Sequence, residues 1–166
     1  MTREIAQVID AILDAEGGIK DVGDGKGETR FGQTPQWLET HGLPKPANRD
    51  QAFANYALWM SRLKLDALVT VNQFAGHVVT DMAVHFGEST AIKTLQRALG
   101  VTDDGVIGPH TLSKFQQVGS TRRFQQALLA QKGKAYGDLL ASVTVDRRKW
   151  ARGWMNRYAQ QILDLP

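Results

Sequence analysis

Residues 2–34 read TREIAQVIDAILDAEGGIKDVGDGKGETRFGQT, and within this stretch a regular helical pattern gives way to a glycine-rich one. Five apolar side chains recur at steps of three and four residues: Ile5, Val8, Ile9, Ile12 and Leu13. This spacing predicts an amphipathic helix, with Thr2 as its N-cap and Gly17-Gly18 at its end. Residues 17–34 then hold six glycines and little apolar periodicity, which predicts a functional loop or a small irregular hairpin.

The rest of the chain also has mostly helical spacing. Helix starts are indicated at Pro35, Asn48 or Asp50, Ser89 or Thr90, and Pro109. Residues 66–87 are almost continuously apolar and predict one buried central helix, and two more helices are expected over 121–140 and 146–163. No run alternates apolar and polar residues for long enough to predict a real sheet. The predicted fold class is therefore all-α (mainly α), with a short irregular or β-hairpin excursion near residues 19–34.

The composition limits the class of protein. The 166 residues include no cysteine, which excludes disulfides, a thiol nucleophile and thiolate metal ligands. The net charge of +3 and the pI near 9.3 mildly favour anionic partners such as bacterial wall polymers. The N-terminus has no signal-peptide pattern, and no run approaches the ~20 apolar residues of a membrane span. We therefore expect synthesis in the cytoplasm without a signal peptide, and no stable membrane insertion.

Glu16 is a candidate catalytic acid because of its position at the end of the first predicted helix. The negative end of the helix dipole and partial burial both disfavour a carboxylate there, which would raise its pKa toward the range of a general acid. Glycosidases pair such an acid with a second group that activates water or stabilises the charged sugar. Asp24 is the candidate for this second role, and the Thr29 hydroxyl could help to hold the water. The alternative is an ordinary solvated glutamate followed by a glycine cap.

Four segments of the chain carry a further pattern, in the order 16–34, 81–87, 95–112 and 150–157. The first opens with Glu-Gly-Gly, the third contains Asp-Asp-Gly-Val-Ile-Gly-Pro, and the last contains Gly-Trp-Met-Asn-Arg. Together they resemble glycoside hydrolase family 108 and the peptidoglycan-binding domain that follows its catalytic domain. The resemblance implies a lysozyme-like fold and N-acetylmuramidase activity. It also implies that Glu16 is the essential acid, as in the Glu-Asp-Thr triad of phage-type lysozymes.

Four positions depart from the pattern of that family. Gly25 stands where proline is usual, and Lys26 replaces the first residue of a glycine pair. Gln33 replaces isoleucine, and His85 replaces asparagine. The alignment of Asp24 survives these changes, which bear on the shape of the loop and on the second catalytic role.

The resemblance also predicts the organisation of the chain. We expect a catalytic lobe over residues 1–90 and a peptidoglycan-binding lobe over residues 91–166, packed on it to form one compact unit. The residues expected to contact substrate are Thr34, Tyr56, Asp81, His85 and Asn156.

Other patterns have an ordinary structural interpretation beside the functional one. Asp103-Asp104-Gly105 lacks the further ligands and the closing glutamate of an EF-hand, so a turn is expected. Asp81 lies four residues from both His77 and His85, and here a buried polar ridge lining the cleft is favoured over a metal site. Aromatic residues at helical spacing in 150–158 fit a core better than a sugar platform. The basic residues beside them have no nucleic-acid recognition motif. We expect no metal, no cofactor and no nucleic-acid partner.

The predicted function is a peptidoglycan hydrolase that cleaves the β-1,4 bond between N-acetylmuramic acid and N-acetylglucosamine. Two alternatives stay open: a lytic transglycosylase, which needs no second carboxylate, and a non-catalytic wall-binding module. The setting could be phage lysis, as for an endolysin, or wall remodelling during secretion. In either case we expect a monomer that leaves the cytoplasm through a holin or a secretion system and acts in the periplasm or cell wall.

Overall fold

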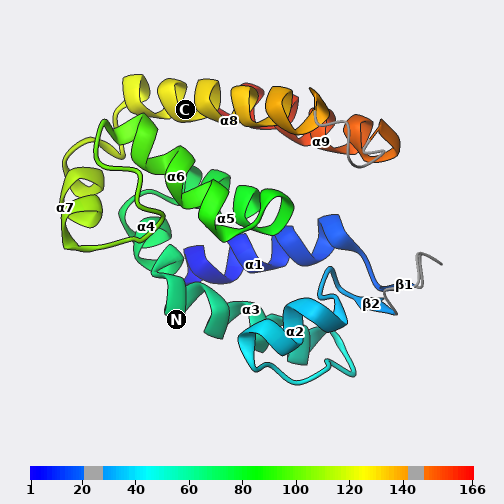
Figure 1. Cartoon of the computed structure of the whole chain (residues 1–166). Helices are drawn as coiled ribbons and strands as arrows, with labels where there is room; N and C mark the ends of the chain where they lie inside the picture. The colour runs from blue at the N-terminus through cyan, green and yellow to red at the C-terminus, as the bar shows by residue number, and fades with distance from the viewer. Residues whose placement is uncertain (21–27, 142–147) are drawn as a thin grey trace. The chain divides into compact units, whose positions relative to one another are not determined.

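The computed structural model describes residues 1–20, 28–141 and 148–166, without the side chains of residues 148–150. The described residues form nine α-helices and one two-stranded antiparallel sheet (Figure 1). The predicted mainly α fold class is confirmed, and the architecture is consistent with a lysozyme-like fold. The chain divides into two compact units, Met1–Gln73 and Phe74–Pro166.

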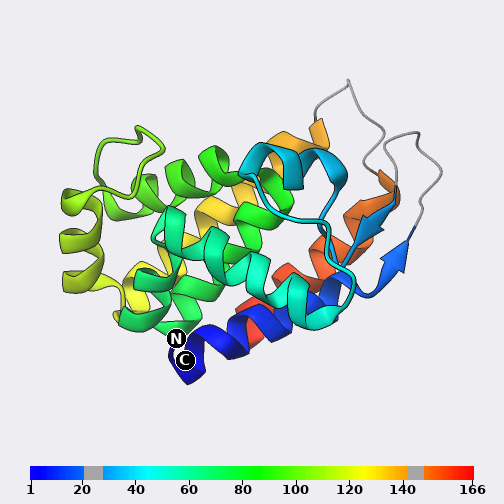
Figure 2. The same cartoon turned by 90° about the horizontal axis from the view of Figure 1, so that it is seen from below.

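The first unit is built around its N-terminal helix, which packs against two later helices. Its elements are α1 (Arg3–Glu16), β1 (Ile19–Lys20), β2 (Thr29–Arg30), α2 (Pro35–His41), α3 (Arg49–Leu63) and α4 (Leu65–Val71). The apolar face of α1 is buried where this helix contacts α3 and α4, and α3 also contacts α4. The two short strands follow the C-terminal end of α1, as Figures 1 and 2 show.

Local capping accounts for the bounds of three helices in this unit. The Thr2 hydroxyl accepts a hydrogen bond from the backbone N–H of Ile5, and Gly17 ends α1 at φ 75°. Pro35 is at the first turn of α2, and the Asn48 side chain caps α3 by accepting from the N–H of Gln51. These predicted starts and the predicted end of α1 are confirmed, because each depends on residues within one helical turn.

The predicted β excursion is a short hairpin. Ile19 pairs with Arg30 and Lys20 pairs with Thr29 in antiparallel register. After β2 the chain turns back through Phe31 at φ 54° and Gly32 at φ 81°, both in the left-handed region. The hairpin therefore ends in a tight left-handed turn beside the end of α1.

The second unit consists of helices and connecting loops within its described residues. Its helices are α5 (Gln73–Phe86, which begins at the last residue of the first unit), α6 (Glu88–Leu99), α7 (Pro109–Val118), α8 (Arg122–Ala141) and α9 (Arg148–Leu163). α6 packs against α7 and α8, and α8 packs against α9. The predicted end at Gly100, in the left-handed conformation, and the predicted start at Pro109 are confirmed.

Two predicted helix bounds are wrong. Residues 66–87 do not form one helix, because Asn72 is extended at φ −152° and ψ 112° and separates α4 from α5. The β-branched run Val69-Thr70-Val71 precedes this break and favours helix only weakly. α6 begins at Glu88 rather than after Ser89 or Thr90, because Gly87 takes the N-cap position at φ 84° and no side chain caps the helix.

The division into compact units falls upstream of the boundary expected at residue 90. The boundary lies between Gln73 and Phe74, so that α6 and all of α5 except its first residue belong with the C-terminal helices. A functional division at residue 90 stays a prediction. Within the part of the chain that the structure describes, no helix has the length and apolar character needed to span a membrane.

Candidate functional site

The candidate site in the first unit begins with Glu16, the last residue of α1. Its side chain is half-buried, and the next residue, Gly17, turns the chain away from the helix. The Lys20 Nζ atom donates a hydrogen bond of 3.1 Å to the backbone carbonyl of Glu16. This contact satisfies a carbonyl that the end of the helix leaves without an intrahelical donor. Glu16 therefore lies at the negative end of the α1 dipole, just before the hairpin.

Gly32 brings the returning loop directly against Glu16. A Cβ atom at this position would lie 2.7 Å from Cγ of Glu16 and 2.8 Å from the hydroxyl oxygen of Tyr56. Both distances are shorter than side chains tolerate, and the φ of 81° already disfavours any residue other than glycine. The lack of a side chain at Gly32 thus lets α1, α3 and the loop after the hairpin meet at one point.

Tyr56 holds this loop in place from α3. Its side chain is 2% exposed, and its hydroxyl donates a hydrogen bond of 3.1 Å to the carbonyl of Phe31. Burial raises the pKa of Tyr56, and the nearby charge of Glu16 raises it further, so that the phenol stays protonated as a donor. The rings of Trp37 and Trp59 pack against it at centroid distances of 5.6 and 5.9 Å. Tyr56 therefore supports the backbone next to Glu16.

Gln33 is a second residue that holds the loop in place. From the sequence alone, Gln33 was noted only as a departure from a family pattern. It is 1% exposed, and its Nε2 donates to the carbonyl of Ala52 at 2.8 Å. Its Oε1 accepts from Nδ2 of Asn55 at 2.8 Å, and Asn55 also donates to the carbonyl of Pro44. The signal that could have revealed this buried network was a glutamine at a position where the family pattern has isoleucine, because a buried polar side chain needs hydrogen-bond partners.

Glu28 is held between two basic residues. Its carboxylate is hydrogen-bonded to Arg30 and lies 3.2 Å from Nζ of Lys45. The hydrogen bond from Arg30, followed by that from Lys45, lowers the pKa of Glu28, so that it stays anionic at neutral pH. These three residues, with Leu38 and Leu43 among others, line a pocket of about 270 Å³.

The other residues predicted for this site have different positions. Asp24 lies outside the described residues. Thr29 is half-buried in β2, opposite Lys20. Thr34 is the N-cap of α2, and its hydroxyl accepts a hydrogen bond of 3.1 Å from the N–H of Trp37. The structure thus brings Glu16 together with Tyr56, whereas the roles predicted for Asp24, Thr29 and Thr34 in catalysis and binding stay predictions.

Asp81, in the second unit, is the centre of a buried ionic network. Its Oδ2 accepts hydrogen bonds from Nζ of Lys132 at 2.5 Å and from Nε2 of Gln161 at 3.3 Å. Gln161 in turn accepts from Lys132 at 2.7 Å, and Lys132 is fully buried. His85 and Arg157 approach the other oxygen of Asp81 at 3.6 and 3.8 Å. This network joins α5, α8 and α9.

Opposing effects set the charges in this network. Burial raises the pKa of Asp81, but Lys132, His85 and Arg157 outweigh burial and lower it to about 2. Burial lowers the pKa of Lys132, and the Asp81 carboxylate opposes that shift. A carboxylate that is 5% exposed and hydrogen-bonded to Lys132 supports the packing of its unit. The substrate contacts predicted for Asp81, His85 and the exposed Asn156 stay predictions.

Among residues 1–20, 28–141 and 148–166, no group of three or more histidine or acidic side chains is placed to hold a metal ion. The Asp103-Asp104-Gly105 segment lies in the loop between α6 and α7, where the chain bends at Gly105 with φ 80°. Asp104 accepts a hydrogen bond from Gln96 at 2.6 Å and another from the N–H of Val106. The Asp104 carboxylate therefore has hydrogen-bond donors from within the protein.

Comparison with known proteins finds a family similarity in the C-terminal part of the chain. Residues 90–159 match the family model described as Predicted Peptidoglycan domain. The chain is also similar to a solved structure of SagA from Brucella abortus, with 24% sequence identity and a TM-score of 0.74 over 95% of this chain and 90% of that chain. The similarity to SagA shows the fold. No curated protein matches. The family match supports peptidoglycan as the partner of residues 90–159.

Proposed function

We propose that the protein is a peptidoglycan hydrolase of the N-acetylmuramidase type, with Glu16 as the general acid. The observation that carries this proposal is the position of Glu16, which is half-buried at the end of α1. Gly32 has no side chain and lets the loop after the hairpin pack directly against Glu16. Glu16 is only half-buried at this place, so a polymer could still contact it. The match of residues 90–159 to a peptidoglycan domain supports the substrate class.

In the proposed reaction, Glu16 protonates the oxygen that leaves when the β-1,4 bond breaks. A general acid of this kind must carry its proton before the reaction begins. Asp24, with help from Thr29, would orient the attacking water or stabilise the positively charged sugar. Tyr56 and Gln33 take no part in bond breaking in this scheme, since they hold the loop that faces Glu16.

We expect the Glu16→Gln variant to lose at least about a hundredfold in rate on purified peptidoglycan, because an amide cannot supply the proton. The measurement is the release of soluble fragments, with Glu4→Gln as the control. Glu4 is an exposed glutamate in the first turn of the same helix, so this control makes the same chemical change at the opposite end. A Glu16→Gln variant that releases fragments at the wild-type rate would show that Glu16 is not the general acid. If the wild-type protein binds peptidoglycan but releases no fragments, the chain is a non-catalytic wall-binding module.

The masses of the products distinguish the hydrolase from the alternative transglycosylase. Fragments with a reducing end indicate hydrolysis, whereas fragments with an anhydro end indicate a lytic transglycosylase. We further propose a monomer that acts in the periplasm or cell wall after release through a holin or a secretion system, in phage lysis or in wall remodelling.

A further inference from the structure

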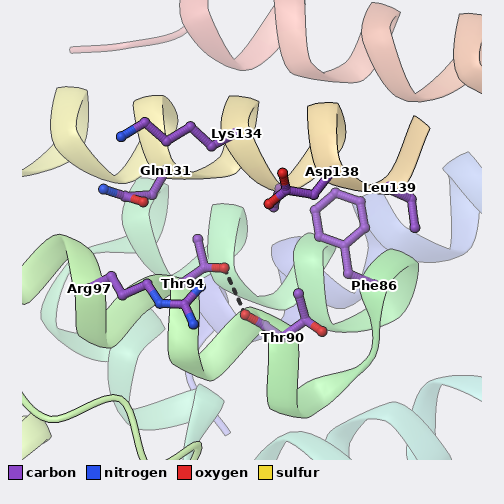
Figure 3. Close-up of a pocket in the computed structure, with 9 residues that line it drawn as sticks. Phe86, Thr90, Thr94, Arg97, Gln131, Lys134, Asp138 and Leu139 are labelled. Carbon is purple, nitrogen blue, oxygen red and sulfur yellow. Dashed lines mark hydrogen bonds between the residues drawn. The ribbon is translucent and has the colours of Figure 1, made fainter. Parts of the chain in front are cut away.

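A second candidate binding site lies entirely within the second unit, between α6 and α8. It is a pocket of about 390 Å³. Arg97, Thr94 and Thr90 on α6 face Gln131, Lys134 and Asp138 on α8 across it, and Phe86 and Leu139 lie together at one end (Figure 3). All of these residues except Phe86 fall in the range 90–159 that matches a peptidoglycan domain. The Glu16 site contributes no residue to this pocket.

The pocket presents charges of both signs. Lys134 and Asp138 are exposed and one helical turn apart on α8, but among the described residues neither forms an ion pair. A lysine that precedes an acidic residue by four positions is the weaker orientation for pairing along a helix. Arg97 donates from Nε to Asp103 at 2.7 Å, which leaves its two terminal amino groups available for a ligand. The pocket can therefore bind carboxylates and an ammonium group at the same time.

The remaining lining offers an apolar surface and neutral polar groups. The Phe86 ring packs edge-on against Tyr136 at a centroid distance of 4.6 Å, and this contact restrains it at the end of the pocket. The Thr94 hydroxyl donates to the carbonyl of Thr90 at 2.7 Å and keeps its lone pairs as acceptors. Gln131 adds an amide that can both donate and accept. Small methyl groups and peptide bonds of a ligand would find partners here.

We propose that this pocket binds the acidic stem peptide of peptidoglycan. That peptide combines carboxylates, methyl side chains and, where diaminopimelate is present, a free ammonium group. Arg97 and Lys134 would bind carboxylates, Asp138 the ammonium, and Phe86 with Leu139 an alanine methyl group. A neutral glycan has no group that requires the three ionic side chains. The inference rests on the association of this unit with peptidoglycan, which belongs to the proposed function, and not on catalysis by Glu16.

The test is isothermal titration of the full-length protein with N-acetyl-L-Ala-γ-D-Glu-diaminopimelate-D-Ala. The acetyl group reproduces the amide that links the peptide to the glycan, and the absence of a glycosidic bond separates binding from cleavage. We expect Lys134→Gln and Asp138→Asn each to weaken binding by about fivefold to tenfold, the range for one exposed charge-assisted contact. Arg123→Gln, which changes an exposed residue of the same helix outside the pocket, should leave the Kd within about twofold, as is usual for a screened surface charge.

A second peptide, acetylated at the diaminopimelate amine, tests the role of Asp138 specifically. It should bind wild type and Asp138→Asn equally, whereas Lys134→Gln should still weaken it. The proposal is overturned if the tetrapeptide does not bind, or if Lys134→Gln and Asp138→Asn leave its Kd unchanged. It is also overturned if these two variants lose binding of chitotetraose, a glycan without peptide. An active Glu16→Gln variant would contradict the proposed catalysis and leave this peptide site intact, so the two failures are distinguishable.

Discussion

Gly32 illustrates how a single residue without a side chain positions the candidate site. Two separate features require glycine at this position. The backbone has a φ of 81°, and an added Cβ would lie 2.7 Å from Cγ of Glu16. The first is a property of the backbone, and the second depends on a neighbour from another element. Substitutions can separate the two, because another left-handed glycine in the same unit has open space around it.

We expect Gly32→Ala to lower the free energy of unfolding by about 1–3 kcal/mol through left-handed strain and the displacement of Glu16. Activity on peptidoglycan should fall with it, since the loop and the acid must move apart. The matched control is Gly42→Ala, at φ 58° with no atom within 4 Å of an added Cβ. Urea unfolding and a rate assay check both variants. Equal effects of the two substitutions on rate would contradict the close approach as the cause.

Asp81 leads to a prediction about pH. Because its folded pKa of about 2 lies below the ordinary value of 3.8, its contribution to stability is present above pH ~4. That contribution is lost as the pH falls from ~4 toward ~2, and it amounts to ~2 kcal/mol. Thermal unfolding between pH ~2 and pH ~6 measures the effect.

The comparison for this pH dependence is Asp81→Asn against Asp103→Asn. Removal of the Asp81 charge leaves Lys132 buried without its partner, which should cost ~3 kcal/mol or more at neutral pH and flatten the acid dependence. Asp103 forms an exposed ion pair with Arg97, so its removal should have little effect. If the stability of Asp81→Asn still fell at acid pH as much as that of the wild type, another group would cause the pH dependence.

At the scale of elements, side-chain caps and glycines set the bounds of most helices in the first unit. α2 is the clearest case, because Thr34 caps its start, Pro35 takes its first turn and Gly42 ends it in the left-handed conformation. A helix of seven residues has little intrinsic stability, so its caps and its packing decide whether it forms. The Thr34 hydroxyl, predicted to bind substrate, is already engaged in this cap.

We expect Thr34→Ala to destabilise the protein by ~1 kcal/mol, because the N–H of Trp37 loses its acceptor. Thr34→Ser keeps the hydroxyl and should retain nearly wild-type stability. Thermal unfolding of the two variants checks the cap, and KM for soluble glycan fragments checks the predicted binding role. A raised KM in Thr34→Ala without a change in Tm would favour substrate contact over capping.

At the scale of the whole molecule, the chain divides at Gln73 and Phe74 into two compact units with separate polar networks. Gln33 and Asn55 belong to the first network, and Asp81, Lys132 and Gln161 to the second. The hydrogen bonds of each network lie inside its own unit. Loss of one network should therefore act first on the unit that contains it.

This division predicts a local response to Asp81→Asn. Backbone hydrogen exchange should increase in α5 and α8 more than in α1 and α3, because Asp81 lies on α5 and Lys132 on α8, and local opening follows the lost contacts. Exchange measured by mass spectrometry resolves these helices, and Asp103→Asn again serves as control. A uniform increase over both units would mean that the chain unfolds as one cooperative body.

Much of the helical architecture was predictable from the amino-acid sequence. The start of α1 at Thr2, the caps at Pro35 and Asn48, and the end of α6 at Gly100 follow from residues within one or two turns of each other. The hairpin after Glu16 was predictable from its glycines. The break at Asn72 was not, because apolar residues continue on both sides of it.

Only the tertiary structure decided which distant residues meet. The sequence alone indicated Glu16 as a candidate acid, but not that Gly32 and Tyr56 would surround it or that Gln33 would be buried beneath the loop. The fold also pairs Asp81 with Lys132, 51 residues away, and with Gln161, 80 residues away. The physical reason is the distance along the chain over which each effect acts. Periodicity, caps and glycine conformation act within a few residues, whereas contacts across the chain depend on how whole helices pack.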